Sequence, residues 1–597
     1  MPETQSGKLS NTTTKEYQSS TLQSRDSFRL LRLYPQTPSA DIKCSLKEVN
    51  IADKRGYGAV SYVWGVPNLT RKIYCGNAYI GVTEHIHALL RRVCNSSRDV
   101  YIWIDAICIN QKDLTERSTQ VLLMRKIFSD AGQILIWLGI DPGPAAPAFQ
   151  IISDFNVLCD KAPKGAFRDN NHERLQSAED LHAFVQGSNG RSIANLFQHD
   201  WFHRTWTFQE AFSARPRAAL VLYGDYDIEY EELSVFAVYM CSLAIQGSLQ
   251  THRARMGVNH VVKIKQYANS ENTLLGLLKI THARRATDAR DKIYGLASLV
   301  DPKELPYPPS YEIDDHTLFR DQAVHMIKRA GNLRLLESCI FEDTVAAGLP
   351  SWAPSWAPTD TLVTAFHHEH EPFCPGPAVD PTRTPRVDGD ILKVYGAVVD
   401  AIRKLGCKME LSDFESNTTS FADHENVIEL LLDRESKELR DLATAYGSPE
   451  MRELARAQTL MGGRNRDVSR ADADAAIKVR NHRRVSESNG GGASFGDYSV
   501  NDRAWNDFNE VAYQLMHAAD GRRLCLTKSG RLGWVPLTSE EGDAISVLSG
   551  SQAAIVLRHQ EDNRYQVIGG SYIHGIMDGE ALKEPGQDDQ LGFLQLV

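Results

Sequence analysis

The sequence contains no long apolar run. Crossing a bilayer as a helix takes roughly 20 consecutive apolar residues, whereas the longest apolar segments here, at 133–138 and 218–223, have the length of β-strands. The amino-terminal residues are polar and lack the basic and then apolar layout of a secretion signal. We therefore expect no membrane span and a cytoplasmic location, and the sequence does not separate the cytoplasm from the nucleus.

An excess of basic residues is also missing. The chain of 597 residues has 66 Lys and Arg against 76 Asp and Glu, so its formal net charge is −10. A general nucleic-acid binder needs a basic surface to engage the phosphates. We therefore expect no nucleic-acid partner, and we interpret the Arg-rich run at 464–484 as part of a solvated linker.

The ten cysteines include no C-x-x-C pair. The sequence therefore predicts neither a disulfide framework nor a zinc ribbon, and free thiols in a reducing compartment fit this spacing. Cys108 and His203 would form a nucleophile pair only if the fold brought them together, and nothing in the sequence fixes that geometry. We favour a buried structural role for Cys108.

Motifs for metals and nucleotides are absent as well. The segment FHHEHEPFC, which holds His367, His368, His370 and Cys374, lacks the H-E-x-x-H spacing, so we expect a solvated loop and no metal site there. Gly56 and Gly58 precede a predicted strand instead of following one, and no P-loop motif occurs. The sequence thus predicts no required cofactor.

What the first third of the chain does contain is an alternation of strand and helix patterns. Helical spacing is found at 84–94, after Asp113, where Glu116 completes a capping-box pattern, and at 201–214. The predicted strands are 57–62, 100–104, 133–138 and 218–223. Short connections between such elements are typical of βαβ crossovers, so we expect an α/β fold with a parallel sheet covered by helices on both faces.

The rest of the chain divides by composition. We predict a disordered N-terminus at 1–25, an α/β domain at 26–225 with an insertion at 145–199, and a mainly helical region at 226–461. The stretch 462–497 is rich in Gly, Arg and Ser and is predicted to be a disordered linker. Residues 498–597 are predicted to form a helix and a small β-barrel or β-meander. Its strands are 523–527, 531–536, 544–548, 553–558 and 564–570.

Four ordered blocks of the first third resemble the fungal heterokaryon incompatibility (HET) domain. They are YGAVSYVWG at 57–65, IWIDAICINQKDLTERSTQVLLMRKIF at 102–128, ILIWLG at 134–139 and WFHRTWTFQEAF at 201–212. The resemblance covers roughly residues 25–225. It implies a protein of nonself recognition, in which heterokaryon incompatibility leads to programmed cell death.

The HET domain is in turn similar to the Toll/interleukin-1 receptor (TIR) domain, which has a flavodoxin-like sheet. Ser61 and Tyr62 resemble the end of the first TIR strand, and Asp105 the end of the second. The block with Trp206 and Glu210 resembles the TIR helix whose Glu carries NAD-glycohydrolase activity. The resemblance therefore implies Glu210 as a candidate catalytic residue, NAD as a candidate substrate, and self-association as a mode of action.

Glu210 also has a physical case of its own. On one continuous helix starting near Trp201, the side chains of Phe202, Trp206 and Glu210 share one side, with Gln209 bordering it. A carboxylate beside aromatic rings loses hydration, so its pKa should rise, which suits acid–base work or stabilisation of an oxocarbenium-like state. The alternative is a structural anchor, in which Glu210 pairs with an Arg or accepts an indole N–H.

Candidate binding residues lie at the predicted carboxyl ends of the strands. Asp105 follows such a strand, and ligands of open α/β sheets bind beyond this edge. The other candidates at the edge, or in the loop above it, are Ser61, Tyr62, Trp64 and Gln111. We expect these residues to line one cleft with Glu210, and the alternative is that they serve as helix caps and turn residues.

Two functions remain open at this point. The chain is either a signalling effector that assembles and cleaves NAD, or a non-enzymatic interaction module that acts through self-association and protein partners. No ATPase, WD40 or ankyrin pattern follows the first domain. Sensing would therefore depend on residues 226–597 or on a partner.

Overall fold

The computed structural model describes most of the chain in two compact units, and each is considered by itself below. Unit 1 comprises the described residues of 1–149, 209–233 and 309–312, and unit 2 comprises those of 150–208, 234–308 and 313–597. The described residues are 15–37, 40–53, 56–66, 68–161, 187–215, 218–242, 251–267, 273–357, 373–406, 436–465, 469–471, 474–475, 477–479, 511, 514–515, 518–519, 521–583 and 590–597.

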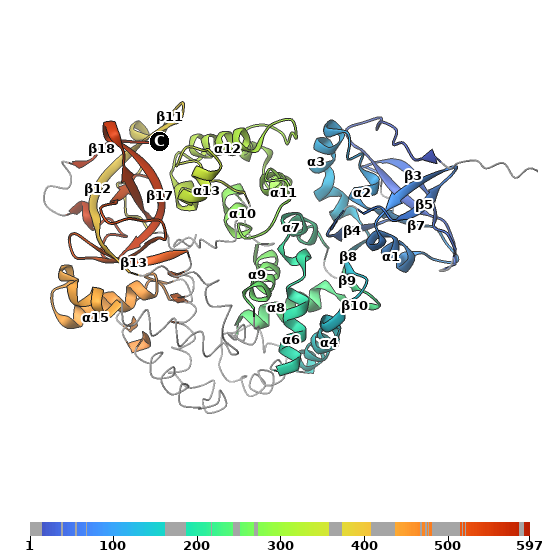
Figure 1. The fold of residues 1–597 in the computed structure, drawn as a ribbon, viewed down its shortest axis with the longest axis horizontal. Coiled ribbons are helices and arrows are strands. Elements are labelled where there is room, and N and C mark those ends of the chain that lie inside the picture. The colour runs from blue at the N-terminus through green and yellow to red at the C-terminus, as the bar shows by residue number, and fades with distance from the viewer. Residues whose placement is uncertain are drawn as a thin grey trace, which may run out of the picture. The chain divides into compact units, whose positions relative to one another are not determined.

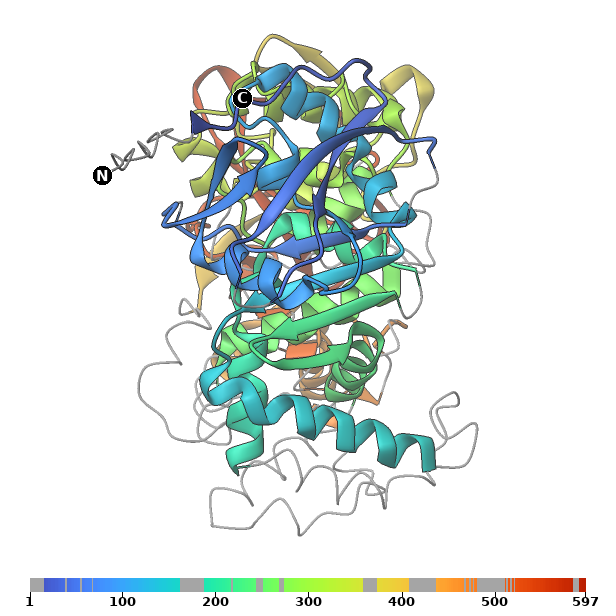
Figure 2. The same cartoon turned by 90° about the vertical axis from the view of Figure 1, so that its right-hand side faces the viewer.

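Unit 1 is built on a ten-stranded mixed sheet whose order is β1-β6-β5-β3-β2-β7-β4-β8-β9-β10. Figure 2 shows it as one twisted sheet, from the blue N-terminal strands to the green β9 and β10. The strands are β1 (Lys15–Glu16), β2 (Ser27–Leu33), β3 (Lys43–Asn50), β4 (Gly58–Tyr62), β5 (Arg71–Cys75), β6 (Ala78–Val82), β7 (Val100–Trp103), β8 (Gln133–Gly139), β9 (Ala219–Tyr223) and β10 (Tyr226–Glu229).

The four strands predicted from the sequence form the parallel centre of this sheet. β4 pairs in parallel with both β7 and β8, and β8 pairs in parallel with β9. The chain runs from β4 outward to β7 and then returns to β8 on the other side of β4. Such a reversal is a topological switch point, and ligands of open α/β sheets bind at the carboxyl ends of the two strands beside it. The predicted α/β class is therefore confirmed.

Helices cover both faces of the parallel centre. They are α1 (Glu84–Val93), α2 (Asp105–Cys108) and α3 (Leu114–Asp130). On one face, Trp103 stacks edge-to-face on Phe128 of α3, with ring centroids 5.5 Å apart. On the other face, the Trp137 indole donates to the backbone oxygen of His85 in α1 at 3.1 Å. Buried aromatic residues of β7 and β8, the two neighbours of β4, thus face opposite helical layers, as the continuous apolar strands predicted.

The capping box predicted at the start of α3 has two halves, and only the Asp113 half is formed. The Asp113 carboxylate accepts the backbone N–H groups of Thr115 and Glu116, each at 3.0 Å, which caps the helix as predicted. Glu116 does not complete the box. Its carboxylate instead forms a two-pronged ion pair with the buried Arg29 of β2, at 2.6 and 2.9 Å. The pair joins α3 to the sheet.

Several strands of unit 1 have no counterpart in the predicted pattern. β2 and β3 pair in antiparallel fashion beside β7, and β5 and β6 form a hairpin whose turn contains Gly76 at a φ of +61°. β1 pairs with β6, so ordered structure begins before residue 26, where the predicted domain starts. Residues 1–14 of the predicted disordered N-terminus lie outside the described residues.

The predicted single helix over 201–214 is wrong, because the chain is extended at Arg204, with φ −86° and ψ 140°. A 3₁₀ turn, η3 (Asp200–His203), precedes α7 (Thr205–Phe212). Between them the backbone pairs with Arg285, whose carbonyl accepts the Thr205 N–H at 2.9 Å. A tertiary contact therefore overrides the helical spacing of the sequence. Phe202 consequently lies outside the helix that carries Glu210.

The middle of the chain is helical, as predicted, and it belongs mostly to unit 2. The helices are α4 (Ala146–Lys161), α6 (Gly187–Phe197), α8 (Tyr230–Ser242), α9 (His252–Tyr267), α10 (Leu274–Ile280), α11 (Asp291–Ala297), α12 (Asp315–Ala330) and α13 (Phe341–Ala346). Figure 1 shows them in colours that run from cyan at α4 to yellow-green at α13. Among the described helices, none combines the length and the apolar character needed to cross a membrane.

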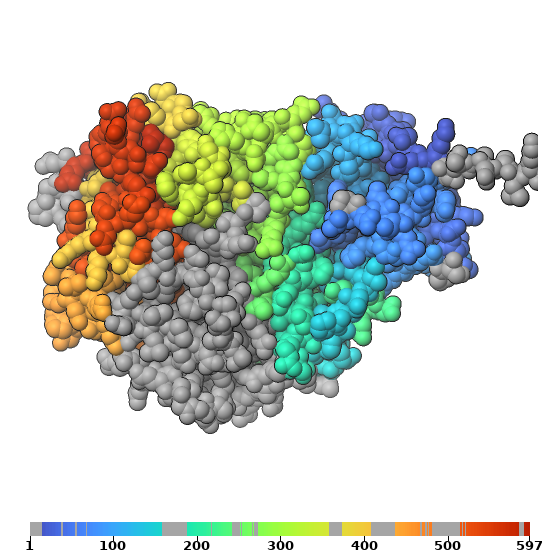
Figure 3. Space-filling view, in the orientation of Figure 1, coloured from blue at the N-terminus to red at the C-terminus, as the bar shows by residue number. Residues whose placement is uncertain are grey.

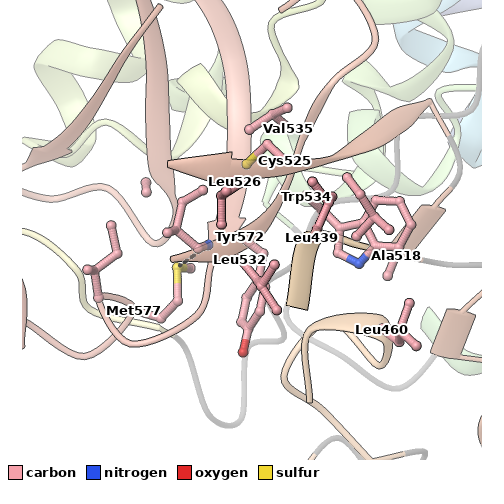
Figure 4. Close-up of a cluster of buried hydrophobic side chains, with 14 of the residues drawn as sticks. Leu439, Leu460, Ala518, Cys525, Leu526, Leu532, Trp534, Val535, Tyr572 and Met577 are labelled. Carbon is pink, nitrogen blue, oxygen red and sulfur yellow. Dashed lines mark hydrogen bonds between the residues drawn. The ribbon is translucent and has the colours of Figure 1, made fainter. Parts of the chain in front are cut away.

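The carboxy-terminal part of unit 2 is a closed β-barrel. Its pairings run in a ring, β12-β13-β14-β17-β16-β15 and back to β12, and β11 and β18 extend it. The strands are β11 (Arg386–Asp388), β12 (Ile391–Leu405), β13 (Arg522–Thr527), β14 (Leu532–Pro536), β15 (Ala544–Leu548), β16 (Ala554–His559), β17 (Arg564–Ile573) and β18 (Gly592–Leu596). Buried side chains of the barrel strands, such as Trp534 of β14 and Tyr572 of β17, belong to the hydrophobic cluster shown in Figure 4.

Two boundaries in unit 2 differ from the prediction. β12 lies inside the region predicted to be mainly helical, although the alternating burial of Leu392 and Val394 is a strand pattern. Described residues in the first part of the predicted linker are packed: Arg464 lies over the Phe373 ring at 4.4 Å, and Ala475 is fully buried. The linker was predicted from its content of Gly, Arg and Ser, and composition does not reveal that an Arg side chain stacks on a distant aromatic ring. Residues 480–497 lie outside the described residues.

Candidate functional site

The centre of the candidate site is a hydrogen bond between β4 and α7. The Ser61 hydroxyl donates to a carboxylate oxygen of Glu210 at 2.5 Å, and both residues are in unit 1. Ser61 is 1% exposed and Glu210 is 4% exposed. The carboxylate therefore sits against the last residues of β4, at the switch point of the sheet, and is enclosed by protein in this structure.

The neighbours of Glu210 on α7 have different surroundings. Gln209 is fully buried, and its amide N–H lies 3.8 Å from the Met124 sulfur of α3. Trp206 belongs to unit 2, where its indole N–H donates to the Asp291 carboxylate at 2.9 Å. The indole that was predicted to flank Glu210 is thus held by a different acid.

A second group of predicted residues gathers around Asp105. The Trp64 indole N–H donates to the Asp105 carboxylate at 2.8 Å, and the Gln111 amide donates to the Asp105 backbone oxygen at 3.0 Å. Trp64 is 36% exposed, so this group is open to solvent at the carboxyl ends of β4 and β7. Part of the pattern is turn chemistry, because the Asp105 carboxylate also accepts the Ala106 N–H at 2.7 Å.

On the opposite face of the same edge, the predicted Tyr62 is joined by two residues that sequence reasoning missed, His85 and Trp137. Tyr62 is buried and stands in register with Trp137 of β8, and His85 packs against that indole with ring centroids 6.0 Å apart. Burial lowers the pKa of His85, so its imidazole is neutral at physiological pH. Gly139 makes room for it, since a Cβ there would lie 2.9 Å from the His85 Nε2. His85 is the second residue of α1, which directly follows β6, and this position near a strand end is the sequence signal that could have indicated it.

Cys108 is the buried structural cysteine that the sequence favoured. It is fully buried, its sulfur accepts the Ile104 N–H at 3.5 Å, and burial raises the pKa of its thiol to about 12. A thiol with this pKa is protonated at neutral pH and is a poor nucleophile. His203, its conceivable partner, is in unit 2, where its Nε2 lies 3.1 Å from the Phe197 carbonyl oxygen.

Metal ligation receives no support from the described part of the chain. Among those residues, no group of three or more His, Cys, Asp or Glu side chains is arranged to hold a metal ion. The histidines of the FHHEHEPFC segment lie outside the described residues, and Cys374 is exposed.

The site contains two carboxylates that differ in solvent exposure. Glu210 is enclosed and hydrogen-bonded to a hydroxyl, whereas Asp105 is partly exposed beside an indole face. An exposed carboxylate and an indole suit a ligand with hydroxyl groups and a flat ring. An enclosed carboxylate can act on such a ligand only after the site opens, because a catalytic group must come within hydrogen-bond reach of the reacting atoms.

Comparisons with known proteins identify both ends of the chain. The family model of the heterokaryon incompatibility protein (HET) matches residues 57–210, which run from the start of β4 to Glu210. The model of the Het-6 beta-barrel domain matches residues 496–591, which hold most strands of the barrel. No solved structure matches the chain.

The match to a curated relative extends along nearly the whole chain. The chain is 24% identical to "Heterokaryon incompatibility protein 6, OR allele" of Neurospora crassa, in an alignment that covers 94% of this chain and 95% of that protein. The two family models and this relative agree with each other. The chain has one segment that matches the heterokaryon incompatibility (HET) model and one that matches the Het-6 β-barrel model, and over nearly its whole length it is similar to a heterokaryon incompatibility protein.

Proposed function

We propose that this protein acts in nonself recognition, and that its HET domain is the effector part that drives programmed cell death. The relative from Neurospora crassa is named for heterokaryon incompatibility, and it aligns with both the HET domain and the barrel. The alignment with the whole relative carries the proposal, because it includes the helical middle as well as the two family domains. The proposal places the protein in the cytoplasm.

For the chemistry, we propose cleavage of the nicotinamide–ribose bond of NAD at the carboxyl edge of the sheet. In this reaction water attacks the ribose C1′ as nicotinamide leaves, which yields ADP-ribose, nicotinamide and a proton. Glu210 would stabilise the positive charge that develops on the ribose, as carboxylates do in glycoside cleavage. The resemblance to TIR domains and the location of Glu210 beside the switch point support this role.

The groups around Asp105 would hold the substrate. Trp64 is exposed enough to stack on a flat ring, and Asp105 would accept ribose hydroxyl groups. Glu210, at 4% exposure, would reach the ribose only when α7 or the end of β4 shifts. Self-association is the proposed trigger of this opening, so activity should depend on assembly.

The test is nicotinamide release from NAD by the purified full chain, measured with and without a crowding agent that promotes assembly. Glu210→Gln keeps the side-chain volume and retains an oxygen that can accept the Ser61 hydroxyl, so a folded variant is expected to lose turnover. Glu84→Gln is the matched control, because Glu84 is an exposed acid of the same unit that pairs with Arg71 at the surface. Turnover that survives Glu210→Gln, or none in assembled wild-type protein, would overturn the NAD proposal.

The burial of Glu210 favours a second candidate, a HET domain that acts by assembly without catalysis. In that case the Ser61–Glu210 hydrogen bond is an anchor that fixes α7 on the sheet. Light scattering on the same samples separates the two: assembly without any nicotinamide release supports the interaction module, and release that rises with assembly supports the enzyme.

A further inference from the structure

Two cysteines that are far apart in the sequence are direct neighbours in the sheet of unit 1. β3 and β5 lie side by side in Figure 1 and pair in parallel, and Cys44 stands opposite Cys75 in their register. Adjacent strands are about 4.8 Å apart, within the range of roughly 4.4–6.8 Å between the Cα atoms of a disulfide. Paired residues also project their side chains from the same face of a sheet. The backbone therefore already has the geometry that a Cys44–Cys75 bridge requires.

The pairing at this place is short. Only two residue pairs join β3 to β5, Lys43 with Tyr74 and Cys44 with Cys75, whereas β2 and β3 pair over seven. Cys75 is also the last strand residue before the turn at Gly76. A covalent link at this position would fasten the β5–β6 hairpin to the sheet where the hydrogen-bonded pairing is thinnest.

A pocket reaches Cys44 from the surface, and Cys75 is itself partly exposed. The pocket has a volume of about 380 Å³ and is lined by Tyr34, Asp41, Lys43, Cys44, Tyr74 and Gly76. Asp41, Lys43 and Gly76 are exposed, whereas Cys44 is only 1% exposed at the inner wall. The segments that carry these residues belong to the blue surface of Figure 3. A small reagent can therefore approach Cys44 through the pocket and Cys75 from its partly exposed side.

The two thiols are chemically unequal. Cys44 is buried, and its thiol donates to the Tyr74 carbonyl oxygen at 3.4 Å, whereas Cys75 is partly exposed. The interaction between the two sulfurs lowers the pKa of Cys75 and, together with burial, raises that of Cys44. A more exposed, more acidic cysteine beside a buried one is the arrangement of a peroxide-reactive cysteine and its resolving partner.

We propose that Cys44 and Cys75 form a reversible redox site, in which hydrogen peroxide converts the pair to a disulfide. The Cys75 thiolate attacks one peroxide oxygen, the O–O bond breaks, and the hydroxide that leaves takes up a proton to become water. The resulting Cys75 sulfenic acid is attacked by the Cys44 sulfur, which gives up its proton. The S–S bond forms and the sulfenic hydroxyl leaves as a second water, so the two thiols lose two electrons and one peroxide is reduced.

The experiment uses the full chain, reduced with dithiothreitol, desalted and exposed to hydrogen peroxide. After the remaining thiols are blocked, digestion without reductant and mass spectrometry should reveal a Cys44–Cys75 linked peptide that dithiothreitol removes. In Cys44→Ser, the Cys75 sulfenic acid should persist and be trapped by dimedone, whereas Cys75→Ser should give no adduct at Cys44. Oxidation should raise the melting temperature of the wild type by on the order of 5 °C.

Other cysteines of the chain supply internal controls. Cys94 is a half-buried thiol of unit 1 whose pKa is raised by burial, and Cys374 is exposed. Cys75 should react with peroxide about tenfold faster than Cys94. The proposal is overturned if Cys75 reacts no faster than Cys94, or if oxidised wild-type protein yields no Cys44–Cys75 peptide. The second readout needs no variant, so it decides the matter even if a serine substitution disturbs folding.

Discussion

At the scale of single residues, the hydrogen bond from Ser61 to Glu210 has a measurable structural value. Ser61→Ala removes a donor from an enclosed carboxylate, and a hydrogen bond to a charged group contributes about 1.5–3 kcal/mol to stability. We expect a loss of that size in the free energy of unfolding of unit 1, measured by urea titration. Ser97→Ala, at an exposed position of the same unit, should change it by less than about 0.5 kcal/mol. Equal effects of the two substitutions would mean that the hydrogen bond is not formed in solution.

The buried imidazole of His203 predicts an acid-sensitive unit 2. His203 is 5% exposed, and burial lowers its pKa to about 3, against about 6.5 in the unfolded chain. Between these values the unfolded state binds a proton that the native state does not, so stability is full above about pH 6.5 and falls as the pH decreases toward 3.

From about pH 6.5 to about pH 5 this one group should cost the wild type about 2 kcal/mol. His203→Gln keeps a donor for the Phe197 carbonyl and cannot titrate, so its unfolding free energy should fall by about 2 kcal/mol less over that interval. His316→Gln is the control, because His316 is an exposed histidine of the same unit. Identical pH profiles for wild type and His203→Gln would contradict the assignment.

At the scale of elements, the cap of α3 can be tested with a conservative pair of variants. Asp113→Ala removes the side chain that accepts the Thr115 and Glu116 N–H groups, which should cost about 1 kcal/mol. Asp113→Asn keeps an oxygen at the same place and should retain most of the stability. Chemical denaturation monitored at the tryptophans measures both. An Asn variant as unstable as the Ala variant would show that the charge matters and the cap does not.

The correctly predicted elements are those whose type follows from their own apolar pattern, without help from distant residues. β4, β7, β8 and β9 are continuous apolar runs, which fit only strands of a covered parallel sheet. The helical spacing of 201–214 failed because pairing with Arg285 extends the backbone at Arg204. β12 was missed, since a strand 15 residues long in a region with helical neighbours gives a mixed pattern.

The sequence could name the candidate residues but not how they pair. The strand-end rule predicted Ser61, Trp64 and Asp105 at one edge of the sheet beside Glu210, and in the structure Ser61 pairs with Glu210 and Trp64 with Asp105. Which acid takes which donor depends on tertiary packing. Trp206 and Glu210 lie four residues apart on α7, as the spacing predicted, but the Trp206 indole N–H donates to Asp291, far along the chain. Single-residue spacing carries no information about such distant partners.

At the scale of the whole molecule, the division of the chain differs from the predicted domain of 26–225. Residues 150–208 belong to unit 2, where α6 and η3 pack on α9. The Phe202 carbonyl lies 2.9 Å from His260 Nδ1, and Arg284 donates to the Arg204 carbonyl at 3.1 Å. Cutting the chain at 225 would remove all of these partners.

A fragment of residues 26–225 should therefore fold poorly, because buried groups such as Phe197 and Trp201 would lose their packing. We expect it to be insoluble, or to bind a hydrophobic dye and melt without a cooperative transition, whereas the full chain melts cooperatively. Calorimetry and dye binding on both proteins measure this. A monomeric fragment with a sharp transition would show that the HET domain is independent of the helical region.

The central claim is that the HET domain is an effector whose action depends on the Ser61–Glu210 centre. Its most direct test is inducible expression of the full chain in fungal cells, with growth and viability followed for the wild type, Glu210→Gln and the control Glu84→Gln at equal protein levels. We expect the wild type and Glu84→Gln to arrest growth and Glu210→Gln not to do so. Normal growth with the wild type, or equal arrest with all three proteins, would contradict it.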